Sequence, residues 1–209
     1  MSGLLDASSL MTAFFSESGF GASFNQPFVG PFRSLGSLGC PENSRWGFLL
    51  SLMRCRPYSV TKYSSQVARS VLRDAVARGG FDCIWFEQTQ SAFAALAEGL
   101  LRPGRREAVV LRPHNVESEV IRRIEAGSML GGQYFLALES LFLRKYEKRL
   151  YNQVDLIAPI SDEDLDAIHS LSKPHLAKMV LLPVMGGGSE SFRCQSASER
   201  RNILFVGDC

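Results

Sequence analysis

Long apolar runs, paired cysteines and a one-sided charge are all missing from this sequence of 209 residues. No apolar run approaches the roughly 18 to 20 residues that cross a bilayer, and Asp6 stands where a secretory signal would carry basic residues. The five cysteines form no C-x-x-C pair, which favours reduced thiols over a disulfide framework or a zinc site. The 23 basic and 21 acidic residues provide no basic stripe for nucleic acid. We therefore expect a cytoplasmic protein that does not bind nucleic acid.

The two ends of the sequence differ from its middle. Residues 1–43 are rich in Ser, Gly and Phe without a helical or strand period, so we expect a poorly ordered leader, with a misread gene start as the alternative. Residues 186–201 have the Gly- and Ser-rich composition of a linker. In residues 202–209 an apolar run is followed by glycine, which predicts the first strand of a second domain that this chain does not complete.

Residues 44–185 alternate between helical and strand patterns and are expected to form one domain. Strands are predicted at 82–87, 108–111, 155–160 and 179–184. Helices are predicted from about 44 to just before Arg56, at 63–78, 92–101, 115–126 and 134–152, and after Ser161. Parallel neighbouring strands need crossover connections, so this alternation predicts an α/β fold with a parallel sheet flanked by helices on both faces.

Several polar residues follow the predicted strands at their carboxyl ends, where open α/β sheets place their ligands. Glu87 and Gln88 follow one strand, His114 the next and Ser161 the third. Each also has a structural interpretation: the acid and Ser161 as helix caps, and His114 as a loop residue capping the helix near Asn115. Asn115 and Glu117 support the His114 loop or cap the same helix. No cluster has metal-ligand spacing, so no protein-held metal is predicted.

Three stretches, in this order, resemble the N-terminal domain of family-four glycosyltransferases, which have the glycosyltransferase B architecture. The first is Arg-Pro-Tyr-Ser-Val at 56–60, followed by the strand at 81–87. The second is Arg-Pro-His-Asn-Val-Glu-Ser at 112–118, and the third joins 146–151 to 155–164. The closing run at 203–207 is similar to the strand that opens the family's nucleotide-binding half. Together they cover about residues 56–207.

This resemblance implies a hexosyltransferase-type enzyme that moves a sugar from a nucleotide sugar, its donor substrate, to a glycan, lipid-linked or small-molecule acceptor, without a further cofactor. By resemblance, His114 contacts the donor sugar or orients the acceptor. The acceptor side would be formed by Glu87, Gln88, Asn115 and Glu117. Ser161 would lie in the donor-side cleft, where its helix N-terminus can meet a polar ligand.

The sequence also departs from the family. Residues 1–43 contain no strand with the Gly-rich loop that lies under the donor phosphates, and the donor-gripping motifs of the second half are missing. We therefore predict that the isolated chain is inactive, and a non-catalytic α/β interaction domain, or a relic of such an enzyme, is the alternative. A dinucleotide-dependent oxidoreductase is set aside because no G-x-G-x-x-G follows a strand.

The helix predicted at 134–152 carries a group of basic residues, namely Arg144, Lys145, Lys148 and Arg149. A solvated helix face is the simpler interpretation. The alternative is weak peripheral contact with an anionic membrane at its inner face, which would suit a lipid-linked acceptor.

Overall fold

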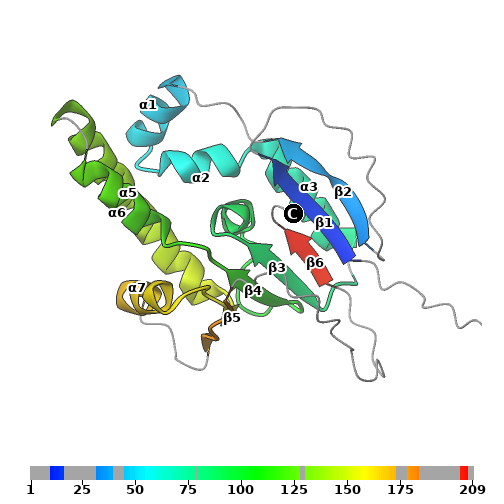
Figure 1. Cartoon of the computed structure of the whole chain (residues 1–209). Coiled ribbons are helices and arrows are strands. Elements are labelled where there is room, and N and C mark those ends of the chain that lie inside the picture. Colours follow the sequence, from blue (N-terminus) through cyan, green and yellow to red (C-terminus); the bar gives the residue numbers. More distant parts are fainter. Residues whose placement is uncertain are drawn as a thin grey trace, which may run out of the picture.

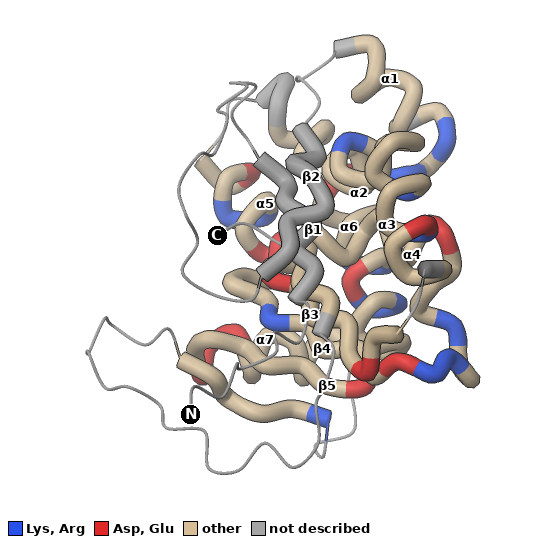
Figure 2. The backbone as a smooth tube through the Cα atoms, turned by 90° about the vertical axis from the view of Figure 1, so that its right-hand side faces the viewer, with Lys and Arg blue, Asp and Glu red and all other residues tan. Residues whose placement is uncertain are grey.

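The computed structural model describes residues 10–16, 32–39, 45–78, 80–127, 130–172, 178–183 and 203–206. Within these residues it has one all-parallel sheet of six strands in the order β2-β1-β6-β3-β4-β5, flanked by helices (Figure 1). Figure 2 shows α3 and α4 on one side of β3 and β4, and α5 and α7 on the other. The predicted α/β class with a Rossmann-like parallel sheet is confirmed.

The described elements alternate along the chain. The strands are β1 (Leu10–Ser16), β2 (Phe32–Gly39), β3 (Cys83–Glu87), β4 (Ala108–Arg112), β5 (Leu156–Ile157) and β6 (Ile203–Val206). The helices are α1 (Arg45–Met53), α2 (Tyr58–Tyr63), α3 (Gln66–Arg78), the 3-10 turn η1 (Gln90–Ala92), α4 (Phe93–Glu98), α5 (Glu117–Ala126), α6 (Leu130–Gln153) and α7 (Asp162–Ser172).

Strands β3 and β4 hold the centre of the core. They pair in parallel from Cys83 opposite Ala108 to Glu87 opposite Arg112. Ile84, Phe86 and Leu111 are at most 1% exposed. Such apolar runs belong to strands that are covered by neighbouring elements, which is why these two were recognisable in the sequence. Because the pairing is parallel, both strands deliver their last residues to one edge of the sheet.

The expectation of a poorly ordered leader at residues 1–43 is wrong where the structure describes them. Two segments of that range, β1 and β2, pair in parallel at one side of the sheet. Strands pair through backbone hydrogen bonds. A segment without alternating apolar residues can therefore still join a sheet beside an existing strand. The remaining residues of 1–43 lie outside the described part.

Strand β6 also differs from its prediction. The run at 203–206 was expected to open a separate domain, but it lies in the middle of the same sheet, between β1 and β3. Leu204 and Val206 are fully buried there. A short apolar strand fits any central position of a parallel sheet, and its sequence does not specify which sheet it joins. The linker predicted at 186–201 lies outside the described residues.

The strand predicted at 179–184 is wrong for its described residues, where only an isolated bridge joins Met179 to Ile157; residue 184 lies outside the described range. Other elements are confirmed with shifted boundaries. The strand predicted at 155–160 is reduced to β5. The helix predicted at 92–101 ends at Glu98, since Gly99 takes a left-handed conformation with φ of 71°. Helix α6 begins at Leu130, ahead of the predicted start at 134.

Two buried carboxylates of α6 fix the starts of other helices. Glu139 accepts hydrogen bonds from the backbone N–H of Tyr58 at 2.8 Å and of Ser59 at 3.0 Å, in the first turn of α2. Glu147 accepts them from Glu117 at 2.7 Å and Ser118 at 3.2 Å, in the first turn of α5. The first N–H groups of a helix have no partner within it, so these carboxylates satisfy both helix starts.

Candidate functional site at the carboxyl ends of β3 and β4

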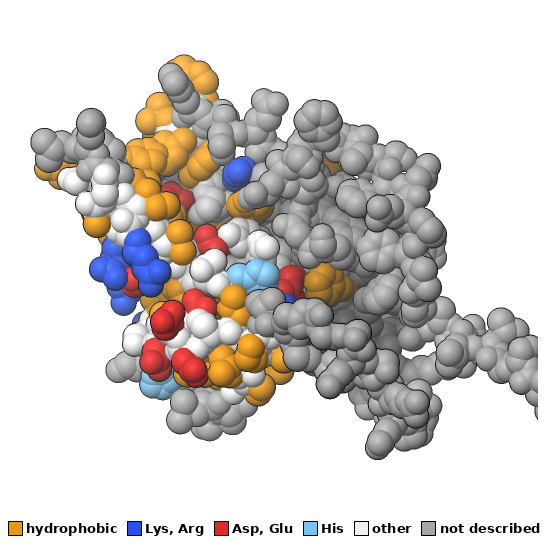
Figure 3. Space-filling view, viewed as in Figure 1, with side chains coloured by type: hydrophobic (Ala, Val, Ile, Leu, Met, Phe, Trp, Pro, Cys, Tyr) orange, Lys and Arg blue, Asp and Glu red, His pale blue; other side chains and the backbone are white. Residues whose placement is uncertain are grey.

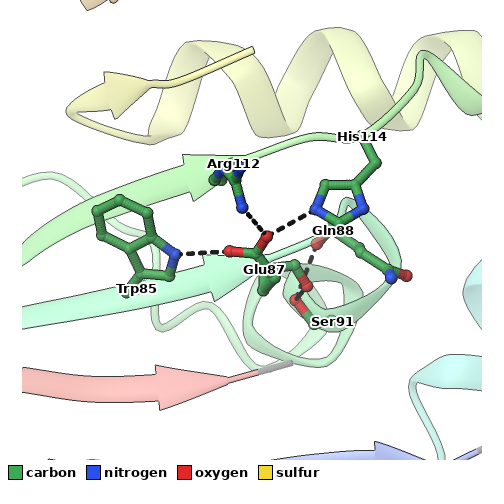
Figure 4. Close-up of polar contacts among 6 residues, drawn as sticks. All are labelled: Trp85, Glu87, Gln88, Ser91, Arg112 and His114. Carbon is green, nitrogen blue, oxygen red and sulfur yellow. Dashed lines mark hydrogen bonds and ion pairs between the residues drawn. The ribbon is translucent and has the colours of Figure 1, made fainter. Parts of the chain in front are cut away.

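A single carboxylate, Glu87 at the end of β3, gathers the polar contacts of this edge (Figure 4). Its Oε1 atom lies 2.6 Å from an Arg112 guanidinium nitrogen and 2.6 Å from Nε2 of His114. Its Oε2 atom accepts a hydrogen bond from the indole N–H of Trp85 at 2.9 Å. The cluster therefore combines two adjacent strands and the loop that follows β4.

The strand register explains why these groups meet. Glu87 stands directly opposite Arg112 in the parallel pair. Trp85 lies two residues before Glu87, and alternate residues of a strand point to the same face. Glu87 is only 7% exposed. A buried carboxylate is stable only when it is paired and hydrogen-bonded, and Arg112 supplies the opposite charge.

His114 lies just beyond β4, and its side chain is 32% exposed. Because Glu87 is an acceptor, the contact favours a proton on Nε2. Figure 4 shows the second ring nitrogen, Nδ1, on the side away from Glu87. Among the described residues no hydrogen bond to Nδ1 is found. A neutral ring held in this way presents a basic lone pair to a ligand.

The turn after β3 holds Gln88 in a strained conformation. Its φ is 71°, in the left-handed region that residues other than glycine enter at a cost of about 1 kcal/mol or more. Its backbone N–H donates to the carbonyl of Arg112 at 2.9 Å. The hydroxyl of Ser91 donates to the carbonyls of Glu87 at 2.7 Å and Gln88 at 2.8 Å. Sequence reasoning did not single out Ser91.

Ser161 begins α7 as a helix cap. Its hydroxyl oxygen accepts the backbone N–H of Asp164 at 3.1 Å and its hydroxyl donates to the Asp164 carboxylate at 2.6 Å. This reciprocal pattern satisfies the start of the helix. The capping interpretation of Ser161 is confirmed, whereas its place in a donor-side cleft stays a prediction.

The capping interpretations of His114 and Asn115 are wrong, whereas that of Glu117 stays a prediction. The N-cap of α5 is Val116, which makes no side-chain capping bond, and Glu147 receives the N–H groups instead. Asn115 is exposed, and Glu117 is the first residue of α5. Their predicted support of the His114 loop, and their acceptor contacts, stay predictions.

Glu147, like Ser91, is a residue that sequence reasoning missed. It is fully buried, and burial raises its pKa to about 7, although hydrogen bonds from Ser118 and Glu117 favour the charged form. The available signal was its place between Leu143 and Leu150, at spacings of four and three on the apolar face of α6. A carboxylate on the buried face of a helix requires hydrogen-bond donors from another element.

Two further observations concern ligands and membranes. Within the described ranges no group of three or more His, Cys, Asp or Glu side chains is arranged to hold a metal ion. None of the helices in that part combines the length and apolar character needed to cross a bilayer. Cys55 and Cys83 are free thiols.

Comparison with known proteins identifies no relative. No protein-family model, no curated protein and no solved structure matches this chain. Its α/β fold and the geometry around Glu87 are therefore the basis for any functional conclusion.

Proposed function

We propose that this chain is the acceptor-side domain of a glycosyltransferase of the family-four type, in which His114 orients the hydroxyl group that receives the sugar. The observation that carries the proposal is the hydrogen bond of 2.6 Å between His114 and Glu87 at the carboxyl edge of β3 and β4. Open α/β sheets bind their ligands at this edge. The ordered sequence resemblance over residues 56–207 supports the same assignment.

The chemistry of sugar transfer fits the cluster. An acceptor hydroxyl must be aimed at the anomeric carbon. Its proton must be accepted as the new carbon–oxygen bond forms and the bond from that carbon to the departing nucleotide phosphate breaks. With Nε2 bonded to Glu87, the Nδ1 atom of His114 is the acceptor for that hydroxyl proton. The positive charge that develops on the ring is stabilised by the Glu87 carboxylate, while Arg112 holds that carboxylate in place from the neighbouring strand.

Sugar binding by the chain tests the proposal. Saturation-transfer NMR with methyl glucoside, methyl galactoside and methyl mannoside measures acceptor binding without requiring a donor domain. At least one glycoside should bind, and His114→Ala should weaken it at least about tenfold, as expected for losing a hydrogen bond to a charged or polarised group. His169→Ala is the matched control, because His169 is an exposed histidine on α7.

Two outcomes would reject the proposal. Absence of binding to all three glycosides would favour a non-catalytic interaction domain. If His114→Ala and His169→Ala weakened sugar binding equally, the binding would not depend on the Glu87 cluster. A parallel assay with UDP-glucose and GDP-mannose should detect no sugar transfer. The sequence lacks the motifs with which the resembled family binds the nucleotide sugar.

A further inference from the structure

Helix α6 presents one outward stripe that changes character along its length. Tyr134, Leu138 and Leu141 occupy its first half, and Lys145 and Lys148 continue the same stripe at spacings of three and four. All five side chains are exposed, with Tyr134 at 79% and Leu141 at 51%. The opposite side of the helix carries the buried Leu143, Glu147 and Leu150. The stripe is thus apolar first and cationic afterwards.

Helix α1 extends the apolar half. Its residues Trp46, Leu49, Leu50 and Met53 recur at helical spacing and are all exposed, Trp46 at 80% and Met53 at 77%. The ring of Phe48 packs against that of Phe135, which places α1 beside the start of α6. In Figure 3 hydrophobic side chains gather over α1. Seven large apolar side chains thus face solvent on two adjacent helices, which is uncommon on a soluble surface.

Arg144 lies beside the basic half of the stripe, which is formed by Lys145 and Lys148. In the described part of the chain, none of Arg144, Lys145 and Lys148 forms an ion pair. These three side chains and Leu141 line a hollow of about 380 Å³ against residues 170–172 of α7. Three uncompensated cations around a hollow of this size suit a phosphate group.

We infer that α1 and the outward stripe of α6 form a docking surface for an anionic lipid bilayer. Trp46 and Tyr134 are suited to the interface between headgroups and acyl chains, where amphipathic aromatic rings concentrate. Arg144, Lys145 and Lys148 meet the lipid phosphates, since basic residues near an anionic leaflet each add to binding. An acidic protein partner would complement only the basic residues. An anionic bilayer complements both halves of the stripe, because it has anionic headgroups and apolar acyl chains. Exposed acids on α7, namely Asp162, Glu163 and Asp166, limit the contact to α1 and α6.

Vesicle sedimentation tests this surface. The chain should bind vesicles of phosphatidylcholine mixed with phosphatidylglycerol at low salt, and should bind neither phosphatidylcholine alone nor the mixed vesicles at high salt. The double variant Lys145→Glu and Lys148→Glu should lower the partition coefficient at least about tenfold. The control is Arg102→Glu with Arg106→Glu, the same charge change at two exposed positions between α4 and β4. Circular dichroism establishes that all variants fold.

Tryptophan fluorescence locates the apolar contact. The sequence contains two tryptophans, and Trp85 is hydrogen-bonded inside the Glu87 cluster. Emission should shift to shorter wavelength when mixed vesicles are added, and Trp46→Phe should abolish the shift while largely retaining sedimentation, because phenylalanine keeps an apolar ring.

Three results would overturn the inference. These are equal binding to neutral vesicles, no effect of the lysine reversals, or a dimer in sedimentation equilibrium that Trp46→Ser dissociates while no vesicles bind. No sugar is present in these assays, so their failure leaves the proposed role of His114 intact.

Discussion

Nε2 of His114 lies 2.6 Å from Oε1 of Glu87, and this contact joins the loop after β4 to the last residue of β3. The carboxylate is nearly buried while the ring is about one-third exposed. One partner is therefore fixed by the sheet and the other can reach a ligand. A general base needs this arrangement. Because its ring is already held by a hydrogen bond, it loses little conformational entropy when the substrate binds.

The first prediction concerns the tautomer of His114. At a pH where the ring is neutral, the proton should reside on Nε2, because only that tautomer donates to the Glu87 carboxylate. Two-dimensional NMR that correlates the ring nitrogens with their neighbouring protons distinguishes the two forms. Glu87→Ala should shift the population toward the mixture found for the exposed His169. An unchanged His114 spectrum in this variant would contradict the observed contact.

The second prediction concerns the strained turn at Gln88. Glycine adopts a φ of 71° without steric cost, so Gln88→Gly should raise the free energy of unfolding by up to about 1 kcal/mol. Urea denaturation measures this change. Gln88→Ala retains the strain and should give no such gain. If Gln88 contacts the acceptor, the glycine variant should be more stable and bind sugar less well, as is common where strain is kept at a functional site.

The third prediction concerns pH and Glu147. Its pKa is raised from 4.5 to about 7 in the folded chain, chiefly by burial, so the folded state binds this proton more tightly than the unfolded state. The resulting stability is fully present below pH 4.5 and is lost as pH rises through about 7. At 1.36 kcal/mol per pKa unit the loss is about 3 kcal/mol.

Glu147→Gln isolates this contribution, because glutamine is neutral at every pH. The unfolding free energy of the native chain, taken relative to this variant, should fall by about 3 kcal/mol across the same pH window. Asp166→Asn removes one negative charge at an exposed position and is the matched control. A native-minus-variant difference that is flat with pH for Glu147→Gln would contradict the raised pKa.

Much of the site was predictable because it follows from strand ends. The apolar runs of β3 and β4 end at Glu87 and shortly before His114. Parallel strands bring their carboxyl ends to one edge, so both residues could be assigned to that edge once the alternation was recognised. The cap at Ser161 was predictable for a local reason, since Asp164 lies within the same turn.

The starts of α2 and α5 were not predictable in this way. Glu147 lies 30 residues from Glu117, and Glu139 lies 81 residues from Tyr58. When a distant helix supplies the capping carboxylate, the sequence next to the capped helix contains no signal for the cap. Asn115, the expected cap, is a good capping residue by type, but Glu147 already satisfies those N–H groups.

The sequence by itself determined the α/β class, most of the helices, the strands β3 and β4, and the polar residues that follow them, because each depends on hydrophobic period and on neighbours within a few residues. Only the tertiary structure decided that β1, β2 and β6 share one sheet with β3, and that Glu87 contacts both His114 and Arg112. It also decided that the apolar residues of α1 and of the outward stripe of α6 stay exposed. Those outcomes depend on which distant segments pair and on which surfaces are covered. Backbone hydrogen bonding decides which segments pair, and burial decides which surfaces are covered. No local stretch of sequence specifies either outcome.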